Sequence, residues 1–160
     1  MSLTTDSGAR FSRCKRYRYA LWRLWDQDRP PVMMIGLNPS TADAQRNDPT
    51  IRRCIGFARD WGAGGLVMTN LFAYRATYPA DLMAAENPVG PRNRYWLRAL
   101  ADQCERLVAV WGNDGRFMNQ SAQIQRLFGH RLEVIRLNKS GEPAHPLYLP
   151  KRLHPRPWPR

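Results

Sequence analysis

Cysteine is scarce in this chain, and its spacing excludes the usual cysteine-based sites. The 160 residues contain Cys14, Cys54 and Cys104, an odd number with long separations. This pattern argues against a disulfide framework and against a CxxC zinc or iron–sulfur centre, and no plausible set of zinc ligands stands out elsewhere. We therefore expect three reduced, buried thiols and no bound metal.

Long apolar runs are also missing. No run approaches the roughly 20 residues of a membrane-spanning helix, and the N-terminus lacks the hydrophobic core of a secretion signal. There is no GxxxxGKS/T loop for nucleotide phosphates, and the glycines from Gly62 to Gly65 precede a predicted strand rather than a helix. The sequence thus predicts a cytoplasmic protein without a membrane partner and without a cofactor.

Acidic residues are few. The chain has 13 Asp and Glu against 25 Lys and Arg, which gives a formal net charge of +12. Such a balance is typical of chains that meet polyanions, so a nucleic acid or a nucleotide is the predicted partner, with Lys151 and Arg152 as candidate nucleic-acid-binding residues. The alternative is a solvated basic surface, because most of the cations are Arg, which a genome rich in G and C also favours.

Strand-like and helix-like segments alternate along the chain. We expect a disordered segment at residues 1–12, a single α/β domain at 13–152 and a Pro/Arg-rich tail at 153–160. Within the domain the patterns predict strands at 17–25, 32–36, 66–71, 107–111 and 132–137, and helices at 49–61, from 79, from 91 and at 117–128. This alternation predicts a three-layer α/β sandwich with a mostly parallel central sheet.

Polar residues follow the predicted strands. The apolar run at 32–35 reads as a strand covered on both faces, and it passes into Asn38 and into two candidate substrate-binding residues, Gly36 and Ser40. The strand at 66–71 carries Asn70 near its end, and His145 stands late in the chain before a proline. Because ligands collect at the carboxyl ends of parallel strands, we expect Asn38, Asn70 and His145 to converge on one edge of the sheet.

These side chains suit the cleavage of an N-glycosidic bond. Breaking this bond leaves positive charge on the sugar and negative charge on the base, so an enzyme needs a placed water and a donor to the base. Asn38 can position the water, Asp43 or Asp48 can face the positive charge, and His145 can donate to the base. Asn70 offers both a donor and an acceptor, which suits the edge of a pyrimidine.

Most of these residues also have a purely structural interpretation. Asn38 before a proline can close a turn, Asp48 can cap the next helix, and Asn70 can close a loop. Two further candidate substrate-binding residues have the same ambiguity: Asn113 lies between glycines as in a turn, and Arg75 can be a solvated surface arginine.

A serine-centred alternative is weaker. Ser40 with His145 and Asp43 imitates an acyl-transfer triad, but no G-x-S-x-G elbow surrounds the serine.

Three segments together resemble the uracil-DNA glycosylase superfamily. The string Gly36-Leu37-Asn38-Pro39-Ser40 is similar to its first motif, in the branches where Asn positions water; Thr69-Asn70-Leu71 is similar to the strand whose Asn reads the pyrimidine edge; and His145-Pro146 resembles the start of its second motif. Their order and separations match over roughly residues 30–150. The resemblance implies that fold, and a hydrolase acting on the N-glycosidic bond of a nucleobase in nucleic acid or a nucleotide.

Four longer strings, GLNPSTAD, DPTIRRC, NLFAYRAT and HPLYL, more closely resemble a bacterial and phage family of unknown function. The chain also departs from the glycosylase pattern. Ser40 stands where a second small Gly is usual, Leu147 and Tyr148 replace the Ser and Pro after His-Pro, and no aromatic residue follows the first motif for base stacking. These departures favour the alternative function, a non-catalytic module of the same fold that binds nucleic acid or a modified base.

Overall fold

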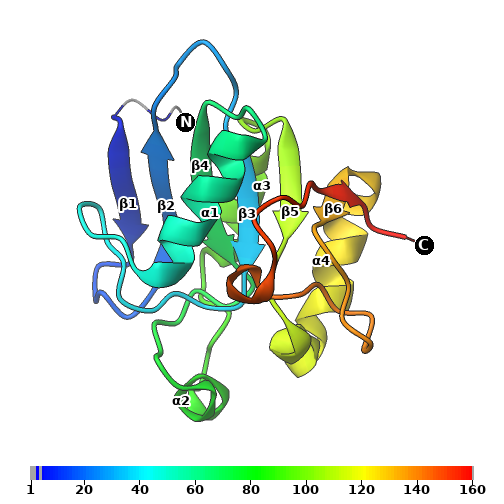
Figure 1. Cartoon of the computed structure of the whole chain (residues 1–160). Coiled ribbons are helices and arrows are strands. Elements are labelled where there is room, and N and C mark those ends of the chain that lie inside the picture. The colour runs from blue at the N-terminus through cyan, green and yellow to red at the C-terminus, as the bar shows by residue number, and fades with distance from the viewer. Residues whose placement is uncertain (1–2, 4, 160) are drawn as a thin grey trace.

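A single seven-stranded sheet forms the centre of the protein. The computed structural model describes residue 3 and residues 5–159. The strands, in the spatial order β1-β2-β4-β3-β5-β6-β7, are β1 (Ser7–Phe11), β2 (Arg18–Leu24), β4 (Gly65–Asn70), β3 (Val32–Gly36), β5 (Arg106–Ala109), β6 (Leu132–Val134) and β7 (Arg156–Pro157). Figure 1 shows these strands side by side, with the long helix α1 (Pro49–Asp60) crossing in front of them.

The sheet is mixed, so the predicted parallel character holds only in its centre. Strands β4, β3, β5 and β6 pair in parallel, whereas β1, β2 and β7 pair antiparallel with their neighbours. The parallel strands are joined by helical crossovers, which parallel pairing requires, and β1 and β2 follow each other through a short connection that favours antiparallel pairing. The sheet is therefore parallel where helices separate its strands and antiparallel at its edges.

The prediction of disorder over residues 1–12 is wrong for residues 7–11, which form β1. Trp22 of β2 is 7% exposed, and its ring lies so close to Gly8 that an added Cβ would be 2.3 Å from it. Burial of the indole against this glycine holds β1 on the sheet, so β2 is an inner strand that pairs with β1 on one side and β4 on the other. Residues 1, 2 and 4, which belong to the same prediction, lie outside the described residues.

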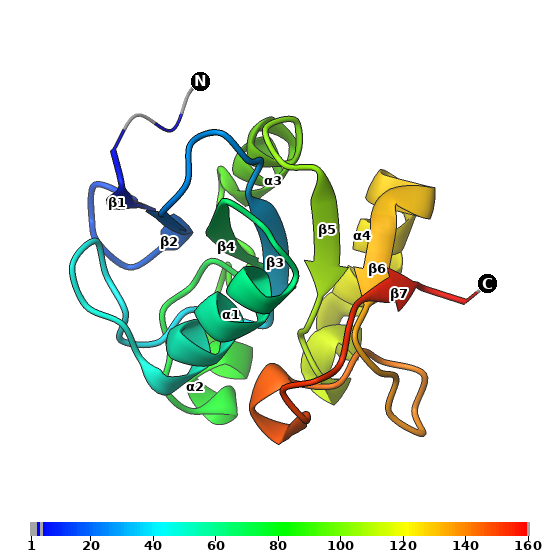
Figure 2. The same cartoon turned by 45° about the horizontal axis from the view of Figure 1, so that its top comes forward.

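Helices cover both faces of the sheet and give the three layers that the alternation predicted. The remaining helices are α2 (Pro79–Ala84), α3 (Asn93–Ala101) and α4 (Gln120–Phe128), with the short 3₁₀ segments η1 (Asn113–Asn119), η2 (Gly129–Arg131) and η3 (Pro146–Tyr148). Figure 2 shows α1 on one face and α3 and α4 on the other. Side chains of β3 alternate between the two cores: Met34 packs with Ile51 of α1, and Met33 packs in the core that contains Leu97 of α3.

Three local predictions need correction. Cys14 is exposed, not buried like Cys54 and Cys104. Helix α4 begins at Gln120 rather than near 117, because Met118 and Asn119 have positive φ angles of 53° and 58°. Strand β6 ends at Val134, three residues short of the predicted end.

The Pro/Arg-rich tail at 153–160 contributes to the sheet through β7, and its Trp158 packs 5.6 Å, centroid to centroid, from Trp111. Among the described residues no helix has the length and apolar character needed to cross a membrane.

Candidate functional site

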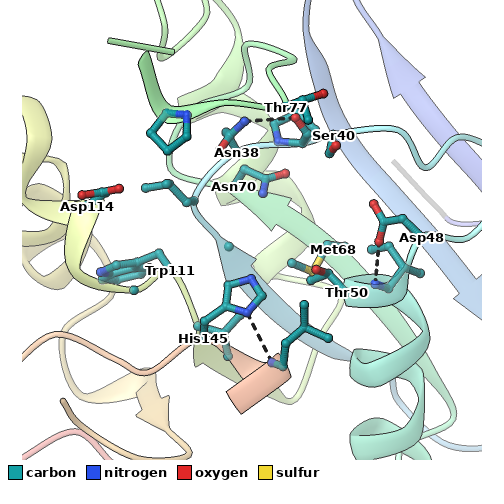
Figure 3. A pocket seen from close by; sticks show the side chains of 18 of the residues that line it. Asn38, Ser40, Asp48, Thr50, Met68, Asn70, Thr77, Trp111, Asp114 and His145 are labelled. Atoms are coloured by element: carbon teal, nitrogen blue, oxygen red, sulfur yellow. Dashed lines mark hydrogen bonds between the residues drawn. The ribbon is translucent and has the colours of Figure 1, made fainter. Parts of the chain in front are cut away.

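A cavity of about 620 Å³ opens at the carboxyl ends of β3, β4 and β5. After β3 the chain passes through α1 to β4 on one side, and after β5 it passes through α4 to β6 on the other, so the loops leaving β3 and β5 diverge. Open α/β sheets bind ligands at such a crevice. Six of the predicted site residues line it: Gly36, Asn38, Ser40, Asn70, Asn113 and His145. Figure 3 labels four of these, Asn38, Ser40, Asn70 and His145.

Asn38 follows β3 and is fixed by its amide nitrogen. Nδ2 donates to the carbonyl oxygen of Ala76 at 2.7 Å and to that of Pro39 at 3.1 Å. Both contacts are made by the nitrogen, so the amide oxygen is left as the acceptor with which Asn38 can serve a ligand or a water. The bond to Pro39 is a local contact with the backbone, as in the structural alternative, and together with the bond to Ala76 it orients the side chain at the cavity wall.

Asn70 is the last residue of β4 and is only 3% exposed, yet its Oδ1 has no hydrogen-bond partner. A buried polar atom without a partner costs about 1–3 kcal/mol. A half-turn of the terminal amide exchanges its oxygen and nitrogen, so Asn70 can present either group to the cavity that it lines. Such an amide is expected where a ligand completes the hydrogen bonds.

Gly36 makes room for this amide. It is the register partner of Asn70 across the parallel β3–β4 pair. A Cβ at Gly36 would lie 2.8 Å from Cε of Met68 and 3.0 Å from Nδ2 of Asn70. The glycine therefore permits the position of the asparagine in the cavity wall.

His145 immediately precedes η3, where Pro146 starts the turn. Its Nδ1 accepts a hydrogen bond from the backbone N–H of Leu147 at 3.3 Å. Burial lowers the pKa of His145 below its usual value of 6.5, and the negative charge of Asp48 opposes this shift. A neutral ring that accepts at Nδ1 carries its proton on Nε2, so His145 is a neutral donor at the cavity.

Of the charged residues that line the cavity, Asp48 was expected as the alternative to Asp43, whereas Arg18 was not assigned to the site from the sequence. Asp48 caps α1, with Oδ1 accepting from the N–H of Ile51 at 2.8 Å, and it also lines the cavity. Arg18 of β2 is 2% exposed, its Nη1 donates to the carbonyl oxygen of Ala42 at 3.0 Å, and its Nε has no partner. Burial lowers the pKa of Arg18 to about 10, against the charge of Asp48. The one available signal was an arginine between two tyrosines, in a strand whose other residues are aromatic or apolar except for Arg23.

Four predicted residues do not join this cavity. The carboxylate of Asp43 closes a turn by accepting from the N–H groups of Gln45 and Arg46, which lower its pKa. Arg75 donates to the carbonyl oxygen of Lys15. Lys151 lines a separate cavity, and Arg152 is exposed.

Ser40 and Asn113 both line the cavity, but their surroundings limit what each can do there. Oδ1 of Asn113 accepts from Asn138 and Ser140, so this residue also ties together two loops. The serine-centred triad is incomplete because Asp43, its third member, turns its carboxylate to its own loop.

Comparison with known proteins identifies the family. No curated protein and no solved structure matches the chain. A family model described as "Protein of unknown function (DUF1643)" matches residues 18–147. This range includes Arg18, Asn38, Asn70 and His145, and it agrees with the family of unknown function that the longer strings predicted. Because the match spans most of the 160 residues, the chain belongs to the DUF1643 family.

Proposed function

We propose that the chain recognises a nucleobase in the cavity at the ends of β3, β4 and β5 and hydrolyses its N-glycosidic bond. The observation that carries this proposal is the meeting of Asn38, Asn70 and His145 in one cavity. The three residues lie far apart in the sequence and come from three different loops or strand ends. These three side chains are the polar groups that the resemblance to the uracil-DNA glycosylase superfamily implies.

The reaction is the attack of water on the sugar carbon that bears the base. The bond between this carbon and the base nitrogen breaks and its electron pair leaves with the base. The water adds OH to the sugar carbon, and the proton that it loses is taken up, through solvent, by the released base. The Oδ1 atom of Asn38 holds the water, since Nδ2 is occupied by two carbonyl oxygens. His145 donates from Nε2 to a base oxygen as negative charge develops there, and one such donor contributes about 10²–10³ in rate.

Base recognition falls to Asn70. Its amide has an unsatisfied oxygen at the end of β4 and borders the cavity. The edge of a pyrimidine offers a neighbouring donor and acceptor, which one amide can pair with in a single plane. Binding a base would therefore satisfy an atom that the protein alone leaves without a partner.

Of the two alternative carboxylates, Asp43 and Asp48, the proposed mechanism uses Asp48. Asp43 lies outside the cavity, whereas Asp48 lines it and uses Oδ1 for the helix cap. Its negative charge would stabilise the positive sugar in the transition state. The buried guanidinium of Arg18 in the same cavity would favour the departing base anion.

The second candidate is a module that binds a base without cutting the bond. It is favoured by the engagement of Asp48 as a helix cap, which reduces the capacity of this carboxylate to activate water. The side chains needed for recognition are the same in both functions, and the two differ in whether free base is released.

The test is release of free base from oligonucleotides that carry uracil, hypoxanthine, alkylated or hypermodified bases, with nucleosides and nucleotides included. We expect Asn38→Ala to lower turnover about 10²-fold with little loss of binding, because a water held for the transition state affects rate rather than affinity. Asn70→Leu should reduce discrimination between bases.

Absence of release from the whole panel, together with binding that depends on Asn70, would leave only the base-binding module. Absence of both release and binding would refute both functions.

A further inference from the structure

A second cavity, of about 520 Å³, lies along the outer side of α1. We call it the α1 groove and define it by the residues that the argument uses: Arg52, Arg53, Gly56, Arg59, Leu147 and Lys151. Leu147 also lines the cavity of Asn38, Asn70 and His145, so the groove and that cavity meet at this residue. A ligand can therefore occupy both.

The groove is strongly positive. Its lining contains four cationic side chains, those of Arg52, Arg53, Arg59 and Lys151, and one carboxylate, that of Asp60. Within the part of the chain that the structure describes, the ion pairs are formed by Asp26 with Arg29, Arg106 with Glu133, and Arg116 with Glu142, and none involves a groove residue. The charge of the groove is thus available to an anionic ligand.

The arginines are spaced along one side of the helix. Positions three or four residues apart share a helix face, which places Arg52, Gly56 and Arg59 in one row. The rise from Arg52 to Arg59 is about 10 Å, since each helical residue adds about 1.5 Å. One strand of a duplex presents about three phosphates over that length of its axis, and a single strand likewise carries repeated phosphates along it.

Two features prepare the groove for close contact. The guanidinium of Arg59 lies 4.2 Å from the centroid of the Trp25 ring, which restricts its motion. A Cβ at Gly56 would meet no atom within 4 Å, so the bare backbone of the helix is open at the middle of the row. Glycine weakens a helix, and packing inside the protein does not require it at this position.

We propose that the α1 groove binds the phosphate backbone of a nucleic-acid strand and leads the strand past Leu147 to the base cavity. This inference rests on the proposed function and specifies its substrate as a polymer rather than a free nucleotide. The repeated positive charges fit a ligand with repeated negative charges, and the neighbouring cavity has the polar groups for one base. An acidic protein segment is the competing occupant.

The first test compares two double variants with the same change of charge. Arg52→Ala/Lys151→Ala removes exposed cations from the groove, and Arg98→Ala/Arg126→Ala removes exposed cations from α3 and α4 on the opposite face. Binding of a labelled single-stranded oligonucleotide with ordinary bases is measured by fluorescence anisotropy at increasing salt.

For single strands, each phosphate that the protein neutralises adds about 0.7 to the salt slope of binding. The groove variant, which has two fewer cations, should therefore have a slope smaller by about 1.4 and bind about tenfold or more weakly at low salt, whereas the control variant should behave like wild type. Equal effects of the two double variants would overturn the proposal, because the weaker binding would then reflect net charge alone.

The second test uses Gly56→Gln and Gly56→Glu, which have the same size and differ in charge. Because the position is open, both variants should fold, which circular dichroism checks. Glu should weaken oligonucleotide binding more than Gln, and salt should reduce the difference. Equal binding by both, or tighter binding of polyglutamate than of the oligonucleotide, would refute the assignment to nucleic acid.

Failure of this inference can be told apart from failure of the proposed function. The probe carries ordinary bases, so its binding does not depend on release of a base. Loss of oligonucleotide binding in the groove variants without any base release by wild type would support the groove and refute the hydrolase. Base release by wild type with unchanged oligonucleotide binding in the groove variants would refute the groove alone.

Discussion

Asn70→Leu is expected to make the protein more stable while it removes base recognition. The two side chains have the same number and branching of heavy atoms, so leucine replaces the amide without a large change in shape. Asn70 is 3% exposed, and its Oδ1 has no hydrogen-bond partner in the folded protein. The substitution therefore removes an unsatisfied polar group and puts an apolar group in a buried place.

The size of the effect follows from the cost of that polar atom. An unsatisfied buried group destabilises by about 1–3 kcal/mol. For a chain of this size, 1 kcal/mol corresponds to about 2–4 °C in melting temperature. Asn70→Leu should thus raise the Tm by about 2–12 °C, measured by circular dichroism in the absence of ligand.

Asn93 provides the matched control. It is also buried, at 1% exposure, and its Oδ1 likewise has no hydrogen-bond partner, but its Nδ2 donates to the carbonyl oxygens of Asn70 and Leu71 at 2.8 and 3.1 Å. Asn93→Leu leaves these carbonyl groups unsatisfied and should lower the Tm, because each carbonyl left without a partner costs about 1–3 kcal/mol. A lower Tm for Asn70→Leu as well would refute the reasoning, since the Asn70 amide would then be a structural group rather than one kept for a ligand.

Further predictions concern the groups around Asn70. Asp48→Asn should keep the helix cap, whereas Asp48→Ala should cost about 1 kcal/mol; both should lower the pKa of His145 further in an NMR titration, because Asp48 raises it. Burial places the pKa of His145 below its unfolded value, so the contribution of the neutral ring to stability is complete above pH about 6.5 and is lost at lower pH. When the pH is lowered, the urea midpoint of wild type should therefore fall more than that of His145→Gln. Gly36→Ala should displace the Asn70 amide, cost about 1–3 kcal/mol in urea unfolding and weaken base binding. A thiol reagent should label Cys14 in the native protein, and the two buried cysteines, whose pKa values burial raises to about 12, only after unfolding.

Much of the fold follows from local patterns in the sequence. Asp48 and Pro49 begin α1 as the cap and first-turn proline predict, and the apolar run before Gly36 forms the central strand β3. At the antiparallel edges, β7 was missed because its pairing with β6 joins segments that are distant in the sequence, and β1 was missed because residues 1–12 were expected to be disordered. Gly8 belongs to that segment, and the close approach of the Trp22 ring to it explains its place in a strand.

The site was predictable where residues follow strands and unpredictable where they approach from elsewhere. Asn38 and Asn70 lie at the ends of parallel strands, whose carboxyl ends share one edge of the sheet. Arg18 reaches the cavity from an antiparallel neighbour, so strand order was needed to place it. Asp43 and Asp48 look equally suitable in sequence, and hydrogen bonds separate them, because Asp43 closes its own turn.

The central claim is that the cavity of Asn38, Asn70 and His145 binds a nucleobase. The most direct measurement is an NMR titration of ¹⁵N-labelled protein with free nucleobases, in which the Asn70 side-chain amide is assigned by its absence in Asn70→Leu. At least one base should shift both this amide and the Nε2 signal of His145, and Asn70→Leu should abolish the shift at His145. If no base moves these two signals, or if a base moves signals only elsewhere in the protein, the claim is contradicted.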